Sequence, residues 1–424
     1  MNQNHHRNMG PRGIIGYFFK SIPEAAYGLV VLLVVVGTGI FSCKENSPDK
    51  GYVAIEPITY HKNGQGYVGS ESCKECHSDI YETHIKTAHY GTSAKADQKN
   101  VHGNFEKGKN HYRLNDSLGF ELVSDRNGAY QQSFLLKEKK QIASDTLGVV
   151  IGSGTKGQTY LKWDGDALYQ LQVSYYAPTD EWTNSPGMSQ DRFADARPVN
   201  SSCLECHVTF AKSTTLYGMG NTFKKDEILY GVDCERCHGP SERHVNLHRE
   251  NPEEQHPFAM KTYDDFTQQQ RLDACALCHS GIRTPKKPAF AFLPGDTLSH
   301  FSIVDETVLK EPRTLDVHGN QYGLLKASAC FEKTETMRCT TCHDPHKPQR
   351  GATAMFNEKC MGCHMANKNI AGCTEKKNRE TGMGTDCVSC HMPMLDSKSM
   401  RIAVGKDSTG TAVQVRTHLI GIYE

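Results

Sequence analysis

The chain has little apolar side-chain content and no net charge of either sign. Only 37% of its 424 residues are hydrophobic, and 48 Lys and Arg balance 48 Asp and Glu. A balanced charge argues against a protein that binds nucleic acid or another polyanion, because such proteins need a basic surface. The low apolar content predicts that something other than side chains supplies part of the interior.

Long apolar runs are also scarce, and the single clear one lies near the N-terminus. The run GLVVLLVVVGTGIFS (28–42) follows basic residues and ends at Cys43, which is typical of a bacterial export signal. Its last residues, IFSC (40–43), resemble a lipobox, so we expect Cys43 to become a lipidated N-terminus. The alternative is an uncleaved anchor helix from about residue 25 to residue 42, which only just reaches the length of a bilayer span. Both interpretations tether residues 44–424 to a membrane, outside the cytoplasm.

Cysteine, in contrast, is abundant and regularly spaced. Fourteen of the 17 cysteines form seven copies of the pattern Cys-x-x-Cys-His, here called motifs 1 to 7 in chain order. This pattern attaches c-type haem: the two sulfurs form thioethers with the porphyrin, and the histidine is the proximal iron ligand. Zinc sites do not require that histidine, and disulfide frameworks do not repeat one spacing in this way. We therefore expect seven covalent haems, held by Cys73, Cys76, His77; Cys203, Cys206, His207; Cys234, Cys237, His238; Cys275, Cys278, His279; Cys339, Cys342, His343; Cys360, Cys363, His364; and Cys387, Cys390, His391.

The second axial ligand of each iron decides whether a haem only carries electrons or can also bind a substrate. Of the 21 histidines, seven belong to the motifs and two precede the export segment, which leaves twelve for the distal positions. His244 and His346 follow their own motifs so closely that a neighbouring haem is the easier target for each. The expected distal ligands are His89, His244, His318, His346 and His418, with His102 and His111 as weaker candidates; His61, His84, His248, His256 and His300 are expected to be solvated, surface or capping residues.

Two cysteines remain outside the motifs and the export segment. Cys330 and Cys373 could form a disulfide in an oxidising compartment, or they could be two independent thiols.

The spacing of the motifs divides the chain unevenly. One motif stands apart from six that lie in the C-terminal half, and the interval between the first two contains aromatic and β-branched runs at 120–138 and 159–176. Asp164-Gly165 inside the second run predicts a β-hairpin turn. We expect a small antiparallel element there, either a packing subdomain or a docking surface for a partner protein. The predicted segments are an export signal or anchor (1–42), a tether (43–69), a haem 1 segment (70–111), a β-rich insertion (112–200) and a six-haem domain (201–424).

For the whole chain, short helices with loops around the motifs predict a mostly α protein with much irregular structure. Its fold would be that of a multihaem cytochrome c with a core of stacked haems and the small β element between haems 1 and 2.

Several longer blocks resemble bacterial multihaem c-type cytochromes of the cytochrome c-554 type. They include YVGSESCKECHSDIYETHIKTAHYG (67–91), GVDCERCHGPSERH (231–244), DVHGNQYG (316–323) and MRCTTCHDPH (337–346). The resemblance implies periplasmic or cell-surface electron transfer, and a distal-ligand role for His89, His244, His318, His346 and His418. The chain departs from the tetrahaem prototype in its number of motifs, so that prototype's pairing of ligands cannot be transferred.

Three functions follow from these patterns. The first is an electron carrier with mostly bis-histidine haems, membrane-anchored in the periplasm or at the cell surface, exchanging electrons with redox partner proteins and not acting as an enzyme. The second is an oxidoreductase that acts on a small nitrogen or sulfur compound at one open haem, although no motif has lysine in place of its histidine. The third is an electron-transfer subunit among neighbouring haem proteins in a larger respiratory complex.

Overall fold

The computed structural model describes residues 52–189, 197–304, 311–364, 386–402 and 410–423. The chain divides into two compact units, Met1–Tyr52 and Val53–Glu424, and all but the last residue of the first unit lies outside the described residues. The predicted export segment and the lipidation site Cys43 therefore also lie outside them. Within the described ranges, no helix is long and apolar enough to cross a membrane.

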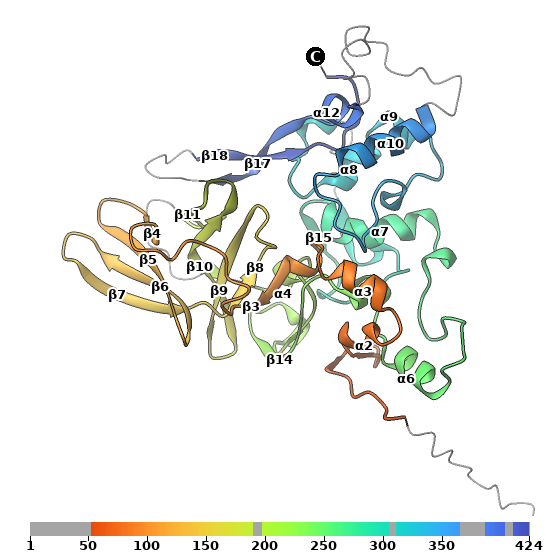
Figure 1. The fold of residues 1–424 in the computed structure, drawn as a ribbon, viewed down its shortest axis with the longest axis horizontal. Helices are drawn as coiled ribbons and strands as arrows, with labels where there is room; N and C mark the ends of the chain where they lie inside the picture. The colour runs from red at the N-terminus through yellow and green to blue at the C-terminus, as the bar shows by residue number, and fades with distance from the viewer. Residues whose placement is uncertain (1–51, 190–196, 305–310, 365–385, 403–409, 424) are drawn as a thin grey trace, which may run out of the picture. The chain divides into compact units, whose positions relative to one another are not determined.

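The second unit begins with strands and short helices around motif 1 and continues into a β-rich region (Figure 1). The strands are β1 (Thr59–Tyr60), β2 (Gly66–Tyr67), β3 (Ser93–Lys95), β4 (His111–Arg113), β5 (Leu118–Asp125), β6 (Gly128–Leu135), β7 (Lys140–Thr146), β8 (Val149–Ile151), β9 (Gly157–Asp164), β10 (Ala167–Tyr176), β11 (Glu181–Asn184), β12 (Arg197–Pro198), β13 (Val208–Ser213), β14 (Phe223–Tyr230), β15 (Arg283–Pro285), β16 (Ser302–Val304), β17 (Met394–Ile402) and β18 (Thr411–Arg416).

Helices dominate only around the motifs. The α-helices are α2 (Glu71–Lys74), α3 (Ser78–His84), α4 (Ser201–Leu204), α5 (Cys234–His238), α6 (Glu242–Glu250), α7 (Gln268–His279), α8 (Gln321–Lys326), α9 (Ala329–Glu332), α10 (Thr353–His364) and α12 (Cys387–His391). The 3-10 turns are η1 (Tyr90–Thr92), η2 (Ala177–Thr179), η3 (Leu216–Gly218), η4 (Tyr263–Asp265), η5 (Leu298–His300), η7 (Pro312–Thr314) and η8 (Cys339–Thr341). Most are shorter than an isolated helix needs for stability, so packing must hold them.

The β-rich region consists of two antiparallel sheets. One has the order β4-β5-β6-β7, and the other has the order β11-β10-β9-β8-β3 with β12 paired to β10. The predicted hairpin is confirmed, since Asp164 pairs with Ala167 across Gly165, which has a φ of 53°. Along β6, buried and partly buried residues alternate, as expected for a strand with one face on a core.

The expectation of a mostly α fold is wrong. The structure is 27% helical and 29% strand, with many antiparallel sheets. Aromatic and β-branched residues at alternate positions favour strands, and the region between motifs 1 and 2 forms two full sheets where we expected one small element. Hairpins β13-β14, β15-β16 and β17-β18 add strands between the later motifs.

Side chains form the interior of this region. One buried cluster includes Leu122, Tyr160, Leu171, Val173 and Trp182 between the two sheets. A second joins the larger sheet to the β13-β14 hairpin and includes Tyr67, Phe210, Phe223 and Phe290. Two smaller clusters lie around α7 and around α8.

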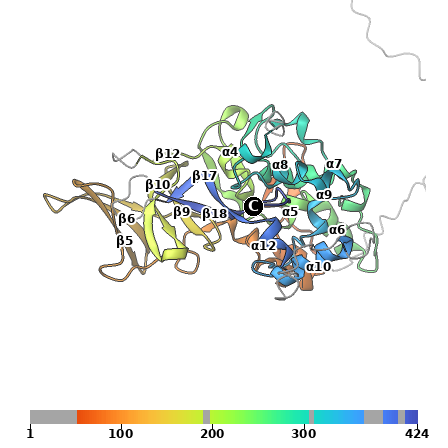
Figure 2. The ribbon, with the colours of Figure 1, turned by 90° about the horizontal axis from the view of Figure 1, so that it is seen from above.

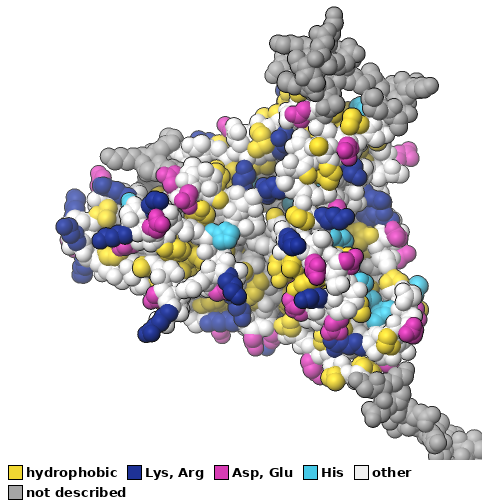
Figure 3. Space-filling view, viewed as in Figure 1, with side chains coloured by type: hydrophobic (Ala, Val, Ile, Leu, Met, Phe, Trp, Pro, Cys, Tyr) yellow, Lys and Arg dark blue, Asp and Glu magenta, His cyan; other side chains and the backbone are white. Residues whose placement is uncertain are grey.

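The β17-β18 hairpin lies beside the sheets in both ribbon views (Figures 1 and 2). Lys156, in the turn before β9, donates to the carbonyl oxygen of Gln414 in β18 at 3.4 Å. On the face drawn in Figure 3, most of the histidine side chains that reach the surface lie on the helical side of this unit. The helical side, which carries the motifs, is therefore where the candidate site is found.

Candidate functional site

Each motif forms or ends a short helical turn. Motifs 3 and 7 coincide with α5 and α12, while α7 and α10 end at the histidines of motifs 4 and 6. On a helix, residues three and four positions apart share one face, so the two sulfurs and the imidazole of a motif point the same way. This is the arrangement that a covalently attached, histidine-ligated haem requires.

Three of these turns begin at a side chain that caps the helix. Asp233 accepts a hydrogen bond from the backbone N–H of Cys234 at 2.8 Å, and Asn200 accepts one from that of Cys203 at 3.2 Å. Asp386 accepts one from the N–H of Ser389 at 3.3 Å. Polar residues at or shortly before the start of these motifs therefore fix where the turn starts.

Three motif histidines each face a histidine from a distant segment. The ring centres are 6.1 Å apart for His89 and His279, for His238 and His346, and for His343 and His418. Imidazole nitrogens bind metals at about 2 Å, so two rings on opposite sides of one metal have centres about 6 Å apart. The three pairs thus fit an iron held between two imidazoles.

Two further motif histidines have a predicted distal ligand nearby. Burial lowers the pKa of His207, and the charge of His318 lowers it further. The pKa of His244 is lowered first by burial, and among its neighbours are His248 and His77 of motif 1. All five of the stronger distal candidates are therefore close to a motif histidine, in each case one outside their own segment.

Buried imidazoles in these pairs are held in the neutral form, which is the form that binds metal. Burial, followed by the charges of neighbouring histidines, lowers the pKa of His89, His238 and His418 to about 4 in each case. The Nδ1 atoms of His244 and His391 contact the carbonyl oxygens of Phe258 and Gly421 at 2.9 Å and 2.7 Å. Such a contact orients the ring and leaves Nε2 for a metal.

Cysteine side chains of different motifs are also in contact with one another. Thiol hydrogen bonds join Cys73 to Cys234, Cys206 to Cys278 and Cys275 to Cys339, and they raise the pKa of Cys234 and lower the pKa of Cys206 and Cys339. Attachment points of motifs 1 and 3, 2 and 4, and 4 and 5 are therefore immediate neighbours.

Other predicted residues are not brought to a motif histidine. The backbone of His102 contacts Gln158 and Tyr160 in the β-rich region, and His111 begins β4. In the described part of the chain, no second histidine ring faces His364 or His391. Cys330 is a free thiol whose Sγ lies 3.7 Å from the Sδ of Met337, while its predicted partner Cys373 lies outside the described residues.

Sequence reasoning undervalued His84, which is buried on α3. Its ring centre lies 6.3 Å from that of His346, and its Nε2 lies 3.4 Å from Asp233 Oδ1. Its burial could not be read from a helix with so few apolar neighbours. Among the described residues, no cluster of three or more His, Cys, Asp or Glu side chains could hold a bare metal ion.

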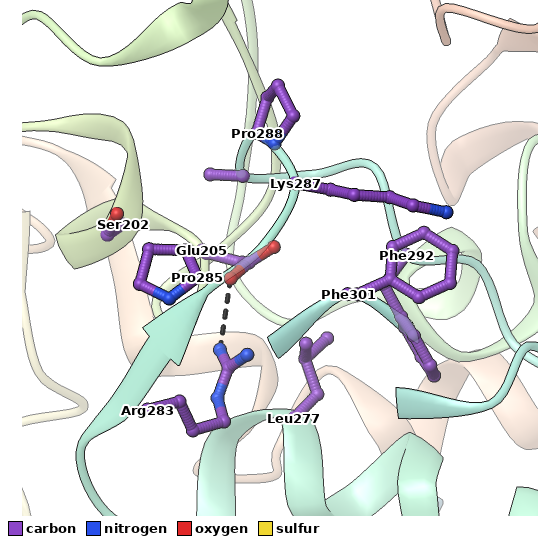
Figure 4. Close-up of a pocket in the computed structure, with 10 residues that line it drawn as sticks. Ser202, Glu205, Leu277, Arg283, Pro285, Lys287, Pro288, Phe292 and Phe301 are labelled. Atoms are coloured by element: carbon purple, nitrogen blue, oxygen red, sulfur yellow. Dashed lines mark hydrogen bonds and ion pairs between the residues drawn. The ribbon is translucent and has the colours of Figure 1, made fainter. Parts of the chain in front are cut away.

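Charged residues between the motif cysteines tie the segments together, a role that the sequence alone did not indicate. Glu235 of motif 3 is buried and accepts hydrogen bonds from the N–H groups of Val68, Gly69 and Ser241. Glu205 of motif 2 pairs with Arg283 at 3.0 Å in the wall of a small pocket between α4 and the segment after α7 (Figure 4). These contacts hold motif 3 against the segment before motif 1, and motif 2 against the segment after motif 4.

Comparisons with known proteins agree with these features. A family model described as cytochrome c554 and c-prime matches residues 174–239, which contain motifs 2 and 3. Among solved structures, the outer cell wall cytochrome OcwA has a similar fold, with a TM-score of 0.50 and 20% sequence identity over 84% of this chain and 79% of that chain. None of the curated proteins compared with the chain matches it. The family match and the shared fold support a multihaem c-type cytochrome with covalently bound haem iron.

Proposed function

We propose that the protein is a membrane-tethered heptahaem c-type cytochrome that carries electrons outside the cytoplasm. The observation that supports it most is the set of histidine pairs, each drawn from two segments and spaced for one metal. When bound, haem iron supplies reversible one-electron chemistry, and the chain's own residues set its ligation, burial and spacing.

Contacts between motif cysteines support a continuous path. They connect motif 1 to motif 3 and motif 4 to both motif 2 and motif 5. Tyr263 joins motifs 3 and 4, since its hydroxyl donates to the carbonyl oxygen of Cys237 at 3.1 Å, and its pKa is raised first by burial and then by the nearby thiols of Cys237 and Cys275. The pKa of Cys360 in motif 6 is raised first by burial and then by the nearby thiols of Cys387 and Cys342. The proposed order is 1, 3, 4, 5, 6, 7, with motif 2 as a branch at motif 4.

Location outside the cytoplasm is supported by the export-like N-terminal sequence and by the similarity to a cytochrome described as belonging to the outer cell wall. In this setting the partners are donor and acceptor redox proteins. As a subunit of a larger respiratory complex, the protein would carry electrons along the same path.

Intact mass spectrometry and the ferric spectrum of the purified chain test the proposal together. We expect a mass that includes seven covalent haems and a spectrum dominated by low-spin iron. A mass with fewer haems would disprove the count, and a spectrum dominated by high-spin iron would disprove the carrier function.

A second candidate function is an oxidoreductase acting on a small nitrogen or sulfur compound. It is favoured by His391, whose Nδ1 is held by Gly421 while no histidine ring faces it among the described residues. A ligand-binding iron at motif 7 would allow a substrate to reach the metal.

A further inference from the structure

Three motif segments converge on one group of charged side chains. Glu205 lies in motif 2, Arg236 lies in motif 3, and Arg283 follows motif 4. Arg236 Nη2 donates to the backbone carbonyl oxygen of Glu205 at 2.7 Å, and the Glu205 carboxylate pairs with Arg283 at 3.0 Å. Figure 4 shows the Arg283 side chain pointing to that carboxylate.

The Glu205 carboxylate, which is the negative charge in this group, already accepts hydrogen bonds from other donors. Besides Arg283, the Glu205 carboxylate accepts the N–H of Phe290 at 2.7 Å, and it is nearly buried. The Nη1 group of Arg283 donates a hydrogen bond to Ser302 Oγ at 2.9 Å. The group therefore contains two arginines and one carboxylate, of which only Arg283 contacts the carboxylate, and it carries an excess positive charge.

Arg236 is the arginine without a carboxylate partner in the described part of the chain. Its guanidinium lies over the ring of Phe290, with 5.5 Å from Cζ to the ring centre. Its Nε is shielded from solvent and has no hydrogen-bond acceptor among the described residues. A charge placed in this way is screened less than one on the surface.

The positive field reaches the attachment points of motifs 2 and 4 as well as Cys237 of motif 3, which carries Arg236 itself. The pKa of Cys206 is lowered to about 7, first by its hydrogen bond with Cys278 and also by the charges of Arg283 and Arg236. When haem is attached, the sulfurs of Cys206 and Cys278 are thioethers and do not titrate. The pKa shift therefore indicates only that Arg283 and Arg236 lie beside these sulfurs. Cys206 and Cys278 hydrogen-bond each other, so one cation acts on motif 2 and motif 4 together.

We propose that Arg236 raises the reduction potential of the haems attached at motifs 2 and 4 together with that of its own motif 3, so that an electron on the path rests preferentially at this junction. The inference relies on the proposed function. The electron comes from a partner redox protein through the neighbouring motifs and converts ferric to ferrous iron, which lowers the positive charge at the metal by one. A nearby fixed cation stabilises the more negative state, so the reduced form is favoured.

The test uses the full-length holoprotein and a spectroelectrochemical titration. Arg236→Gln removes the charge but keeps a donor for the Glu205 carbonyl, and Arg236→Lys keeps the charge without the planar fork. We expect Arg236→Gln to lower one to three midpoints by about a tenfold change in the reduction equilibrium, which is 59 mV for one electron. Arg236→Lys should shift them less.

A matched control is Arg113→Gln, which removes an exposed arginine paired with Asp116 in the β-rich region. It should leave every midpoint in place. Glu205→Gln gives a second test of opposite sign, because removing the negative charge beside the two arginines should raise the same midpoints. This variant keeps the proposal testable if Arg236→Gln does not fold.

The haem content of each variant, measured by intact mass, distinguishes a failure of the proposed function from a failure of the proposed role of Arg236. A wild-type chain without covalent haem would overturn the proposed function. Unchanged midpoints in a fully haem-loaded Arg236→Gln or Glu205→Gln protein would overturn the role of Arg236, as would equal shifts in the Gln and Lys variants of Arg236.

Discussion

The imidazole rings of His343 and His418 lie 6.1 Å apart and nearly parallel, with an angle of 28° between their planes. His343 closes motif 5, and His418 follows β18 near the C-terminus. The segment around His418 is fixed by backbone hydrogen bonds, from Thr417 N to Pro393 O at 3.1 Å and from Gly421 N to His391 O at 3.2 Å. The last residues of the chain therefore connect motif 5 to motif 7.

Replacing His418 tests this connection. In His418→Ala we expect one low-spin ferric signal to be lost and one high-spin signal to appear, because the iron at motif 5 loses an imidazole. Electron paramagnetic resonance of the ferric protein measures both. His300→Ala, which alters an exposed histidine at the end of η5, is the control and should leave the spectrum unchanged. An unaltered spectrum in His418→Ala would rule out the pairing.

Carbon monoxide distinguishes the irons that have two histidines from the others. In the reduced wild-type protein we expect binding only at motifs 6 and 7, because His364 and His391 face no second histidine among the described residues. A difference spectrum with a gas titration gives the stoichiometry. Binding at more than two irons would contradict the five proposed pairs, and no binding at all would show that other side chains complete the last two sites.

Glu235 should matter for stability although it is not a ligand. It is only 3% exposed and accepts four hydrogen bonds, from Val68, Gly69 and both the N–H and the hydroxyl of Ser241. Glu235→Ala would leave these buried donors without an acceptor, which should lower the free energy of unfolding by about 3 kcal/mol. Thermal unfolding of the holoprotein measures the loss. Glu250→Ala, at the exposed end of α6, should have little effect, and an equal effect of both changes would contradict the role of Glu235.

Gly231 positions a ligand segment without touching iron. Its φ is +72°, and a Cβ at this position would collide with the carbonyl oxygen of Tyr90, next to His89. Because Val232 N donates to His89 O at 2.9 Å, Gly231→Ala should displace His89 and produce a high-spin signal at motif 4. Gly108→Ala, at a positive φ of 93° with open space around its Cβ and outside every motif, is the control for the same measurement. A low-spin spectrum in both variants would show that the backbone absorbs the change elsewhere.

Cys43 is the predicted point of membrane attachment. We expect the mature chain to begin at a lipid-modified Cys43, and Cys43→Ala to leave the membrane fraction. Intact mass and cell fractionation measure the two outcomes. A Cys43→Ala protein that stays anchored would favour the uncleaved helix.

The amino-acid sequence by itself determined the attachment chemistry, because two thioethers and an adjacent imidazole need only five consecutive residues. It also indicated His89, His244, His318, His346 and His418, from their spacing to the motifs, their local sequence and the resemblance to cytochromes of the c-554 type. The hairpin at Asp164-Gly165 followed from local turn preferences.

Tertiary structure decided which histidine faces which, because each pair joins segments that are far apart along the chain. It also decided the amount of β-structure, since alternating patterns reveal individual strands but not how many of them join one sheet. The sequence did not indicate the roles of Glu205, Glu235 and Arg236, which occupy the variable positions of the motifs. Their contacts depend on the burial of charges between segments, and no local pattern encodes that.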